Sequence, residues 1–389
     1  MAPILIVGSG LAAYTLAKEF RQRDATTPLM LITADDGAFY SKPNLSNALS
    51  TGKTAAALAA ASAEKMAADF NLKVLPNTRV TALDTGTQRV RLNNISADND
   101  EVHYHKLILA LGADPIAHGL SGDAANEVLA VNDLNDYARF RSVLGAQVVA
   151  GRRRVTVLGG GLIGCEFAND LTNAGYAVSV IHLGDWPLER LLPAEAGKRL
   201  ADSFAALGVN WHFGRSAQRV HHANDGLHVM LDNGEVIATD VVLSAIGLRP
   251  RTQLAQAASI PVNRGIVVDR YLETGAANVF ALGDCAEVDG ANLPYVQPLM
   301  IQARALAATL AGEKTAVVYP PMPVMVKTPA HPVAVLPPKP GATGSWQMDC
   351  SDTGICALHR DASGRLQGFA LTGTETSRRL ALVKELVLV

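Results

Sequence analysis

Short apolar runs, each followed by a glycine turn and a helical stretch, occur twice along this 389-residue chain. Ile4–Val7 is continuously apolar and leads through glycines into a stretch that continues to Phe20. Arg154–Leu158 leads in the same way into a stretch that ends near Asn173. Each pattern predicts a buried strand, a turn and a helix, and such alternation is typical of α/β folds with parallel sheets.

The two turns have the spacing of a dinucleotide-binding fingerprint. Its positions are Gly8, Gly10 and Ala13 in the first turn, and Gly159, Gly161 and Gly164 in the second. The first glycine permits a tight bend, the second lets the backbone approach a pyrophosphate, and the third small residue lets helix and strand pack closely. The pyrophosphate lies at the helix N-terminus, where free N–H groups favour negative charge. One fingerprint is weak evidence, but its recurrence predicts two dinucleotide-binding folds.

Other segments extend both folds and add a third region. Residues 55–70 are rich in alanine and predict a helix, and residues 106–112 predict a buried strand. Residues 240–250 mirror that strand and contain Gly247, a candidate cofactor contact where the chain returns to the first fold. Residues 278–287 predict a strand, a tight Gly-Asp turn and a helix. The proline-rich and alternating pattern near the C-terminus predicts a third, small domain that contains sheet.

Composition places the chain among globular proteins, since 49% of its residues are hydrophobic and 18% are charged. Its net charge of −2 provides no whole-molecule attraction for nucleic acid or for an anionic membrane. The first predicted strand begins near the N-terminus, and no apolar run approaches the roughly 20 residues of a membrane-spanning helix. We therefore expect no targeting peptide, no membrane insertion and a cytoplasmic location.

Residues after the second predicted strand of each fold are candidates for ribose contacts. An acidic residue about 20 positions past the glycines accepts a ribose hydroxyl in such folds. Asp35 and Asp36 stand there in the first fold, although a polar turn after a buried strand has the same appearance. In the second fold His182 occupies this position and Asp185 is a nearby acid that can substitute for it, whereas no arginine occurs before Arg190. We therefore expect NADH rather than NADPH.

The histidines and cysteines do not predict a metal site or a disulfide framework. His221, His222 and His228 lie close together, but no tetrahedral ligand set accompanies them, so solvated side chains are the preferred interpretation. Four cysteines in so long a chain are too few for a secreted disulfide scaffold. They are Cys165, Cys285, Cys350 and Cys356.

Together, the two fingerprints and the turn at Gly283 and Asp284 resemble the FAD/NAD(P)-dependent pyridine nucleotide-disulfide oxidoreductases, over essentially the whole chain. The resemblance implies two Rossmann-like dinucleotide-binding domains, of which the FAD domain is discontinuous, and a small C-terminal α+β domain. It also implies that Asp284 holds the ribityl chain of FAD, although a helix N-cap would suit the same residue. The implied domains are FAD-binding for 1–115, NAD-binding for 116–244, FAD-binding again for 245–319, and C-terminal for 320–389.

The position of the cysteines separates the branches of this family. Disulfide reductases that resemble the chain carry a cysteine pair after the first fingerprint or a Cys-x-x-Cys in the second domain. NADH oxidases and coenzyme A disulfide reductases carry one cysteine near residue 40. Here residues 40–43 are Tyr-Ser-Lys-Pro, and Cys165 is the only cysteine of the second domain. We therefore expect no thiol relay, and direct electron transfer from the flavin to a redox protein.

The finer resemblance is to rubredoxin–NAD reductases of the alkane-hydroxylase type. It rests on residues 34–36, 40–46, 162–170, 283–288 and 323–329. One departure is His182, which stands where the family usually has an acid. The FAD contacts that the resemblance implies are Ser9, Gly10, Leu11, Ala12, Thr33, Ala34, Lys42, Val80, Glu166, Asp284, Val296 and Lys327.

Lys42 and Glu166 are the candidate catalytic residues. The resemblance implies a lysine near the flavin N5 and a glutamate beside it that fixes the lysine. We therefore predict that Lys42 and Glu166, far apart in sequence, form an ion pair beside the nicotinamide site. The simpler alternative is a solvated loop lysine and a glutamate that interacts with the helix dipole.

The predicted function is an NADH-dependent FAD reductase that passes electrons to rubredoxin and serves a hydroxylase. A flavorubredoxin or ferredoxin reductase is an alternative within the same class. A flavin-bound signalling or interaction protein without turnover is the alternative from another class. Reduction of cytochrome c by NADH that requires added rubredoxin would favour the enzyme.

Overall fold

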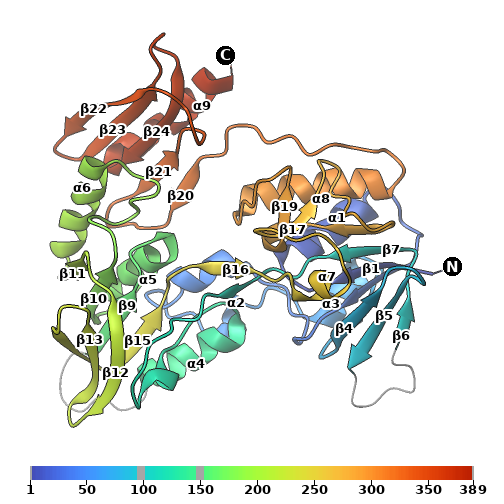
Figure 1. The fold of residues 1–389 in the computed structure, drawn as a ribbon, viewed down its shortest axis with the longest axis horizontal. Helices are drawn as coiled ribbons and strands as arrows, with labels where there is room; N and C mark the ends of the chain where they lie inside the picture. The colour runs from blue at the N-terminus through green and yellow to red at the C-terminus, as the bar shows by residue number, and fades with distance from the viewer. Residues whose placement is uncertain (1, 94–100, 146–152, 388–389) are drawn as a thin grey trace. The chain divides into compact units, whose positions relative to one another are not determined.

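The chain forms two compact units in a computed structural model that describes residues 2–93, 101–145 and 153–387 (Figure 1). Unit 1 consists of Met1–Lys42, Ala59–Asp114 and Leu248–Tyr319, and unit 2 of Pro43–Leu58, Pro115–Gly247 and Pro320–Val389. Residues 43–58, expected in the first part of the FAD domain, thus cluster with unit 2. The four-part domain division stays a prediction.

Unit 1 is built around a five-stranded parallel sheet with the strand order β18–β7–β1–β2–β3. The strands are β1 (Ile4–Val7), β2 (Leu29–Ile32), β3 (Lys73–Leu75), β7 (Lys106–Leu109) and β18 (Val279–Ala281). Helices α1 (Leu11–Arg21) and α8 (Val296–Leu310) pack against each other beside it (Figure 1). Strands in a sheet covered on both faces are apolar along their whole length, which explains the continuous run in β1.

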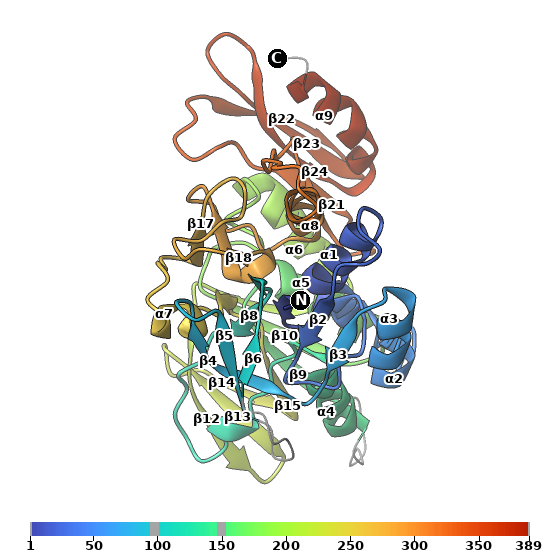
Figure 2. The ribbon, with the colours of Figure 1, turned by 90° about the vertical axis from the view of Figure 1, so that its right-hand side faces the viewer.

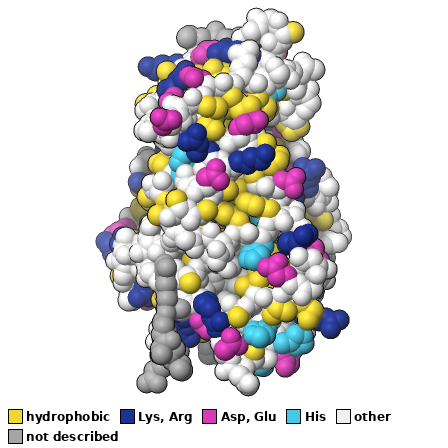
Figure 3. All heavy atoms as spheres, turned by 90° about the vertical axis from the view of Figure 1, so that its left-hand side faces the viewer, with side chains coloured by type: hydrophobic (Ala, Val, Ile, Leu, Met, Phe, Trp, Pro, Cys, Tyr) yellow, Lys and Arg dark blue, Asp and Glu magenta, His cyan; other side chains and the backbone are white. Residues whose placement is uncertain are grey.

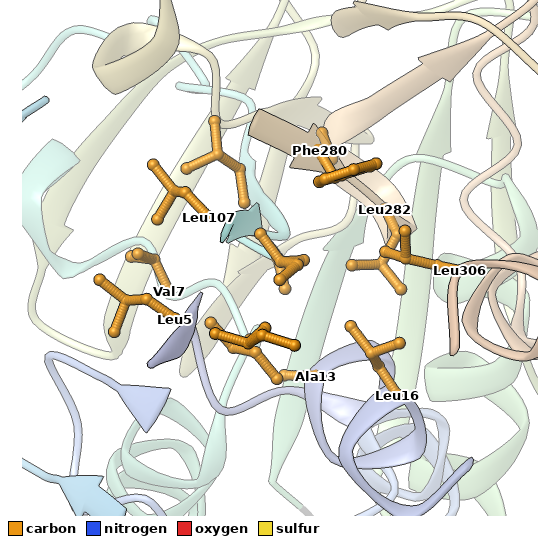
Figure 4. Close-up of a cluster of buried hydrophobic side chains, with 14 of the residues drawn as sticks. Leu5, Val7, Ala13, Leu16, Leu107, Phe280, Leu282 and Leu306 are labelled. Atoms are coloured by element: carbon orange, nitrogen blue, oxygen red, sulfur yellow. The ribbon is translucent and has the colours of Figure 1, made fainter. Parts of the chain in front are cut away.

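The core of unit 1 fixes the position of the first glycine turn. Leu5 from β1, Leu16 from α1 and Leu306 from α8 belong to one cluster of buried side chains, and all three are labelled in Figure 4. All three side chains are fully buried, and burial of a leucine contributes about 1.5–3 kcal/mol. Because this packing holds β1 and α1 together, the turn that joins them has little freedom.

Short elements complete unit 1. Strands β4, β5 and β6 form an antiparallel sheet and lie side by side in Figure 2. Strands β8 and β16 pair with each other, as do β17 and β19. The bounds are β4 (Arg79–Asp84), β5 (Arg89–Asn93), β6 (Glu101–His103), β8 (Ala113–Pro115), β16 (Leu248–Pro250), β17 (Ile266–Val268), β19 (Ala286–Val288), α3 (Ala63–Asp69), α7 (Gln253–Ala257) and the 3-10 turn η3 (Gly283–Cys285).

The structure corrects the helix predicted at the end of residues 278–287. The Gly-Asp turn is the 3-10 turn η3, and it leads into strand β19 instead of a helix. The reason is non-local, since β19 pairs in parallel with β17. The buried Glu287 strengthens this contact, because its carboxylate accepts the N–H groups of Arg264 at 2.7 Å and Gly265 at 3.1 Å.

The single helix predicted for residues 55–70 is also wrong. The segment forms α2 (Ala55–Leu58) and α3, which are separated by an extended stretch. In that stretch the Ala60 N–H donates to the carbonyl of Phe39 at 2.8 Å. Ser62 then caps α3, because its hydroxyl accepts the N–H of Lys65 at 3.3 Å. A tertiary strand contact and a capping residue therefore override the helix propensity of the alanines.

Unit 2 contains a second parallel sheet, with the order β11–β10–β9–β15. This order repeats β3–β2–β1–β7 of unit 1 and confirms the predicted repeat. A three-stranded antiparallel sheet, β12–β13–β14, follows it in sequence. The bounds are β9 (Arg154–Leu158), β10 (Ala177–His182), β11 (Asn210–Phe213), β12 (Ala217–Ala223), β13 (Gly226–Leu231), β14 (Val236–Thr239), β15 (Val241–Ser244), α4 (Leu134–Gly145), α5 (Leu162–Asn173), α6 (Ala194–Ala205) and the 3-10 turns η1 (Lys42–Asn47) and η2 (Ala125–Glu127).

The C-terminal part of unit 2 is a five-stranded antiparallel sheet with the order β20–β21–β24–β23–β22. Helix α6 packs against β23 and β24 of this sheet. The bounds are β20 (Val324–Val326), β21 (Val333–Leu336), β22 (Ser345–Ser351), β23 (Gly354–Arg360), β24 (Leu366–Thr372), η4 (Gly373–Arg378) and α9 (Arg379–Val387). None of the helices within the described ranges has the length and apolar character needed to cross a bilayer.

Candidate functional site

The first glycine turn of unit 1 is shaped for a dinucleotide. Gly8 has φ +114°, and a Cβ there would lie 2.3 Å from the carbonyl oxygen of Ala110. Only glycine fits this close approach between β1 and β7. Gly10 is the N-cap residue of α1, has no side-chain cap, and has open space where a Cβ would point. The helix N-terminus, which starts at Leu11, is thus open to an anion at the point where strand order reverses.

Asp35 connects this turn to the end of β2. Its Oδ1 accepts hydrogen bonds from Ser9 Oγ at 2.8 Å, Thr33 Oγ1 at 2.6 Å and the Gly37 N–H at 3.0 Å. Its Oδ2 accepts from Ser9 Oγ at 3.0 Å. Because a carboxylate offers about four acceptor positions, Oδ2 retains capacity for a ribose hydroxyl. Asp36, in contrast, closes a polar turn by accepting the Ala38 N–H.

The Gly-Asp turn lies beside the same helix start. A Cβ on Gly283 would lie 2.9 Å from the Cβ of Ala12, so this glycine lets η3 approach α1. The Gly283 N–H donates to Gln302 Oε1 at 2.7 Å, which anchors the turn to α8. Burial raises the pKa of the adjacent Asp284 carboxyl, and the positive charge of Lys42 opposes that shift. Lys42 and Asp284 therefore interact electrostatically within unit 1.

The remaining candidate FAD contacts of unit 1 occupy varied environments. Val80 is buried in β4, and Ala34 is exposed just past β2. Val296 begins α8 and is 41% exposed, a high value for an apolar residue at a helix N-terminus. With the open start of α1 and the carboxylates of Asp35 and Asp284, these residues fit an extended dinucleotide such as FAD.

The second glycine turn, in unit 2, repeats the geometry of the first. Gly159 has φ +101°, and a Cβ there would lie 2.7 Å from the carbonyl oxygen of Ala245. A Cβ on Gly164 would lie 1.8 Å from the carbonyl oxygen of Gly159, so the helix packs directly on the turn. Gly161 is the N-cap of α5 and faces open space. Gly247, past the end of β15, has φ +119°.

His182 lies at the end of β10, and its ring belongs to this turn. Its Nδ1 accepts the backbone N–H of Gly160 at 3.1 Å. Burial lowers the pKa of His182 below its ordinary value of 6.5, and the charge of Glu189 partly opposes this. The neutral ring packs edge to face on Phe213, with the ring centroids 6.4 Å apart. Asp185, the predicted substitute acid, is exposed in the following loop.

Glu166, on α5, is almost completely buried, with 1% of its surface exposed. Its Oε2 accepts from Ser46 Oγ at 2.5 Å and lies 3.3 Å from Lys327 Nζ. Its Oε1 accepts the backbone N–H of Lys327 at 3.0 Å. Lys327 Nζ also donates to the carbonyl oxygen of Pro43. Within unit 2 the ion-pair partner of Glu166 is therefore Lys327, whereas the Lys42–Glu166 pair stays a prediction.

The sequence analysis assigned no role to two further polar residues on α5. The Asp170 carboxylate accepts the backbone N–H groups of Leu49 at 2.8 Å and Ser50 at 3.0 Å. Asn169 Oδ1 accepts the N–H of Ala330 at 3.2 Å. Glu166, Asn169 and Asp170 are spaced i, i+3 and i+4, which places them on one helix face. Such a polar face on an otherwise apolar fingerprint helix could have indicated these contacts.

All four cysteines are free thiols, and only Cys350 is exposed. Burial raises the pKa of Cys285 to about 11 and raises that of Cys165 as well. Because the thiolate is the reactive form, these buried thiols are poor nucleophiles at neutral pH.

The three clustered histidines each lie beside an acidic side chain. His221 lies 3.2 Å from Asp123, His222 lies 3.1 Å from Glu127, and His228 lies 3.0 Å from Asp225. Figure 3, which views the molecule from the left-hand side of Figure 1, shows histidines beside acidic side chains at its lower end, where β12 and β13 lie. Across the described residues, no group of three or more potential ligands is arranged to hold a metal ion.

The chain resembles known flavin-dependent reductases along its length. A profile described as pyridine nucleotide-disulphide oxidoreductase matches residues 2–308, and one described as rubredoxin binding C-terminal domain matches residues 316–386. The chain is 49% identical to the rubredoxin-NAD(+) reductase of Alcanivorax borkumensis, over 99% of each chain. It is 43% identical to the rubredoxin-NAD(+) reductase of Acinetobacter baylyi, over 99% of this chain and 98% of that one.

A solved structure of a ferredoxin reductase has a similar fold. The ferredoxin reductase of Rhodopseudomonas palustris superposes with a TM-score of 0.85 at 25% identity, covering 96% of this chain and 91% of that one. This likeness, with the antiparallel C-terminal sheet, confirms the predicted α/β class. The chain therefore belongs to the pyridine nucleotide-disulphide oxidoreductase family and, within it, to the rubredoxin-NAD(+) reductases, oxidoreductases that use FAD and NAD(+) and have rubredoxin as their partner.

Proposed function

We propose that this chain carries electrons from NADH through FAD to rubredoxin in a chain that serves a hydroxylase, as in alkane oxidation. The observation that carries the proposal is the match of residues 316–386 to a rubredoxin-binding domain, in one chain with two dinucleotide turns. The hydroxylase context rests on the finer sequence resemblance alone. Its test is reconstitution of NADH-dependent alkane hydroxylation with this reductase, a rubredoxin and a hydroxylase.

The residues of unit 1 bind and orient the flavin in this proposal. Bound FAD supplies the chemistry that accepts a hydride from NADH and releases its two electrons singly. The open N-terminus of α1 takes the pyrophosphate, the Asp35 carboxylate accepts a ribose hydroxyl, and Asp284 holds the ribityl chain. The raised pKa of Asp284 is consistent with this role, because a half-buried carboxyl gains from a hydroxyl partner in place of lost water.

Charged residues tune the flavin environment. Lys42 interacts with Asp284 in unit 1, and Lys327 is held by Glu166 in unit 2. We assign both lysines to the flavin, where positive charge near N5 and the pyrimidine edge favours the anionic reduced form. Glu166 limits that effect by neutralising part of the charge. Lys42→Met should therefore slow flavin reduction by NADH far more than it weakens FAD binding. A variant that loses FAD but is reduced normally when loaded would contradict this assignment.

The acceptor is tested by direct comparison. Purified reductase is supplied with NADH and equal concentrations of rubredoxin, ferredoxin or flavorubredoxin, and the initial rate of acceptor reduction is recorded. We expect the highest kcat/KM for rubredoxin. A higher kcat/KM for flavorubredoxin or ferredoxin would identify that protein, rather than rubredoxin, as the physiological acceptor. Absence of turnover with all three, in a flavin-loaded protein, would favour a non-enzymatic flavoprotein.

A further inference from the structure

The histidine at the nucleotide-discriminating position turns its ring onto the glycine turn. His182 Nδ1 is occupied by the Gly160 N–H at 3.1 Å. Its Nε2 is buried and has no hydrogen-bond partner among the described residues. The ring lies directly on the turn, because a Cβ on Gly160 would lie 3.0 Å from its Cγ. His182 is thus part of the scaffold of the turn, and its neutral ring carries no negative charge that could repel a 2′-phosphate.

The loop that follows β10 folds back onto the same turn. The N–H of Leu188 donates to the carbonyl oxygen of Gly160 at 2.9 Å. Leu188 adopts a left-handed conformation with φ +58° and is 3% exposed, so tertiary packing holds this bend. Trp186 Nε1 donates to the carbonyl oxygen of Leu192 at 3.0 Å and closes the loop. Glu189 therefore directly follows the residue that is hydrogen-bonded to the fingerprint turn.

The Glu189 carboxylate lies against Gly184, two residues past the end of β10. A Cβ on Gly184 would lie 1.9 Å from Glu189 Oε2, so the carboxylate occupies the space beside the end of β10. Within the described parts of the chain, no residue forms an ion pair or hydrogen bond with this carboxylate. An acidic group at the end of the second strand is what binds a ribose 2′-hydroxyl in dinucleotide folds. Glu189 thus supplies from the loop the carboxylate that His182, at the end of β10, lacks.

We propose that Glu189, rather than Asp185, is the carboxylate that accepts the ribose hydroxyl of NADH and repels the 2′-phosphate of NADPH. His182 is a positioning residue that holds the glycine turn. The inference rests on the proposed nucleotide site of unit 2. A hydroxyl donates to a carboxylate, whereas a phosphate at the same place meets a like charge, so one group produces both effects.

The test measures nucleotide binding to the FAD-loaded protein by calorimetry, with NAD+ and NADP+ as ligands, and compares kcat/KM for NADH and NADPH. Glu189→Gln keeps the shape and removes the charge. We expect it to improve NADP+ affinity relative to NAD+ by about five- to tenfold, as removal of one like charge near a phosphate predicts. Glu195→Gln, at an exposed position six residues further on, is the matched control and should leave the ratio unchanged.

Two further variants make the outcome decisive. Gly184→Ala places a methyl group where the Glu189 carboxylate lies, and should lower discrimination in the same direction. Asp185→Asn tests the rival acid. A shift of the NADP+/NAD+ ratio in Asp185→Asn together with an unchanged ratio in Glu189→Gln would overturn the proposal. Failure of the unmodified protein to bind either nucleotide would instead refute the nucleotide site itself.

Discussion

Glu166 illustrates how a single buried residue organises its surroundings in unit 2. Three donors surround its buried carboxylate, namely the Ser46 hydroxyl, the Lys327 ammonium and the Lys327 backbone N–H. The family resemblance named this residue as a catalytic candidate. It could not predict Lys327 as the partner, because 161 residues separate them in sequence and no local pattern encodes such a contact.

Replacing Glu166 with glutamine should destabilise the protein. The amide places an NH2 group among donors and leaves Lys327 without its counter-charge. Since the Lys327 side chain is 38% exposed, water screens part of the loss, and we expect the free energy of unfolding to fall by about 1–3 kcal/mol. Urea denaturation of the FAD-loaded protein measures this change. Glu195→Gln should have little effect, and a Glu166→Gln variant as stable as the parent would show that the pair contributes nothing.

The cysteines give a second prediction at the residue scale. Cys165→Ala and Cys285→Ala should each retain rubredoxin reduction within about threefold, because the raised pKa values of these buried thiols disfavour the reactive thiolate. Steady-state turnover per bound flavin is the measurement, which corrects for loss of folded protein. A folded, flavin-loaded variant that is inactive would restore the thiol-relay mechanism.

At the element scale, local patterns predicted the strand–turn–helix units. They failed where tertiary contacts determine the secondary structure. The two glycine turns were predicted with their positions, because their backbone geometry requires glycine. The strand β19 was predicted as a helix, because its partner β17 lies about 20 residues earlier and leaves no local periodicity. The break between α2 and α3 was missed for the same reason, since Phe39 supplies the contact.

Asp170 should hold residues 43–58 onto α5. Its carboxylate binds two consecutive backbone N–H groups, at Leu49 and Ser50. Asp170→Ala leaves both donors unpaired, which costs about 1.5–3 kcal/mol. We expect faster hydrogen exchange at these two amides and faster proteolysis within 43–58. Asp202→Ala, at an exposed position on α6, is the control. Unchanged exchange at Leu49 and Ser50 in Asp170→Ala would contradict the role.

The second glycine turn should depend on pH through His182. Protonation of Nδ1 removes the acceptor for the Gly160 N–H. Burial lowers the folded-state pKa of His182 below 6.5, while the charge of Glu189 opposes the shift and that of Arg190 reinforces it. The hydrogen bond to the neutral ring therefore contributes its full stabilisation of the turn above pH 6.5. The contribution is lost as the pH falls through the lowered folded-state pKa.

NADH binding reports this dependence. The Kd for NADH should be constant above pH 6.5 and rise as the pH falls through the lowered pKa of His182. His182→Asn keeps an acceptor oxygen at the position of Nδ1 without a titrating group, so its Kd should stay flat over the same range. An equal rise in the parent protein and in His182→Asn would assign the titration to another group.

At the scale of the whole molecule, the chain combines two folds with dinucleotide turns and a C-terminal region that matches a rubredoxin-binding domain. The repeat of strand order in β7–β1–β2–β3 and β15–β9–β10–β11 explains why the family and the cofactors could be predicted from sequence. The rubredoxin partner came from resemblance alone, because nothing in the periodicity of the C-terminal sheet specifies what it binds. The residues that we propose to tune electron transfer depend on contacts across long sequence separations, such as Glu166 with Lys327.

One measurement tests the central claim, that electrons pass from NADH to rubredoxin through bound FAD without a thiol. The FAD-loaded protein is mixed anaerobically with one equivalent of NADH and excess oxidised rubredoxin, and the flavin and rubredoxin absorbances are followed together. Recovery of the flavin absorbance should coincide with reduction of about two rubredoxins per NADH, since each takes one electron. A flavin that is reduced by NADH and stays reduced while rubredoxin remains oxidised would contradict the account.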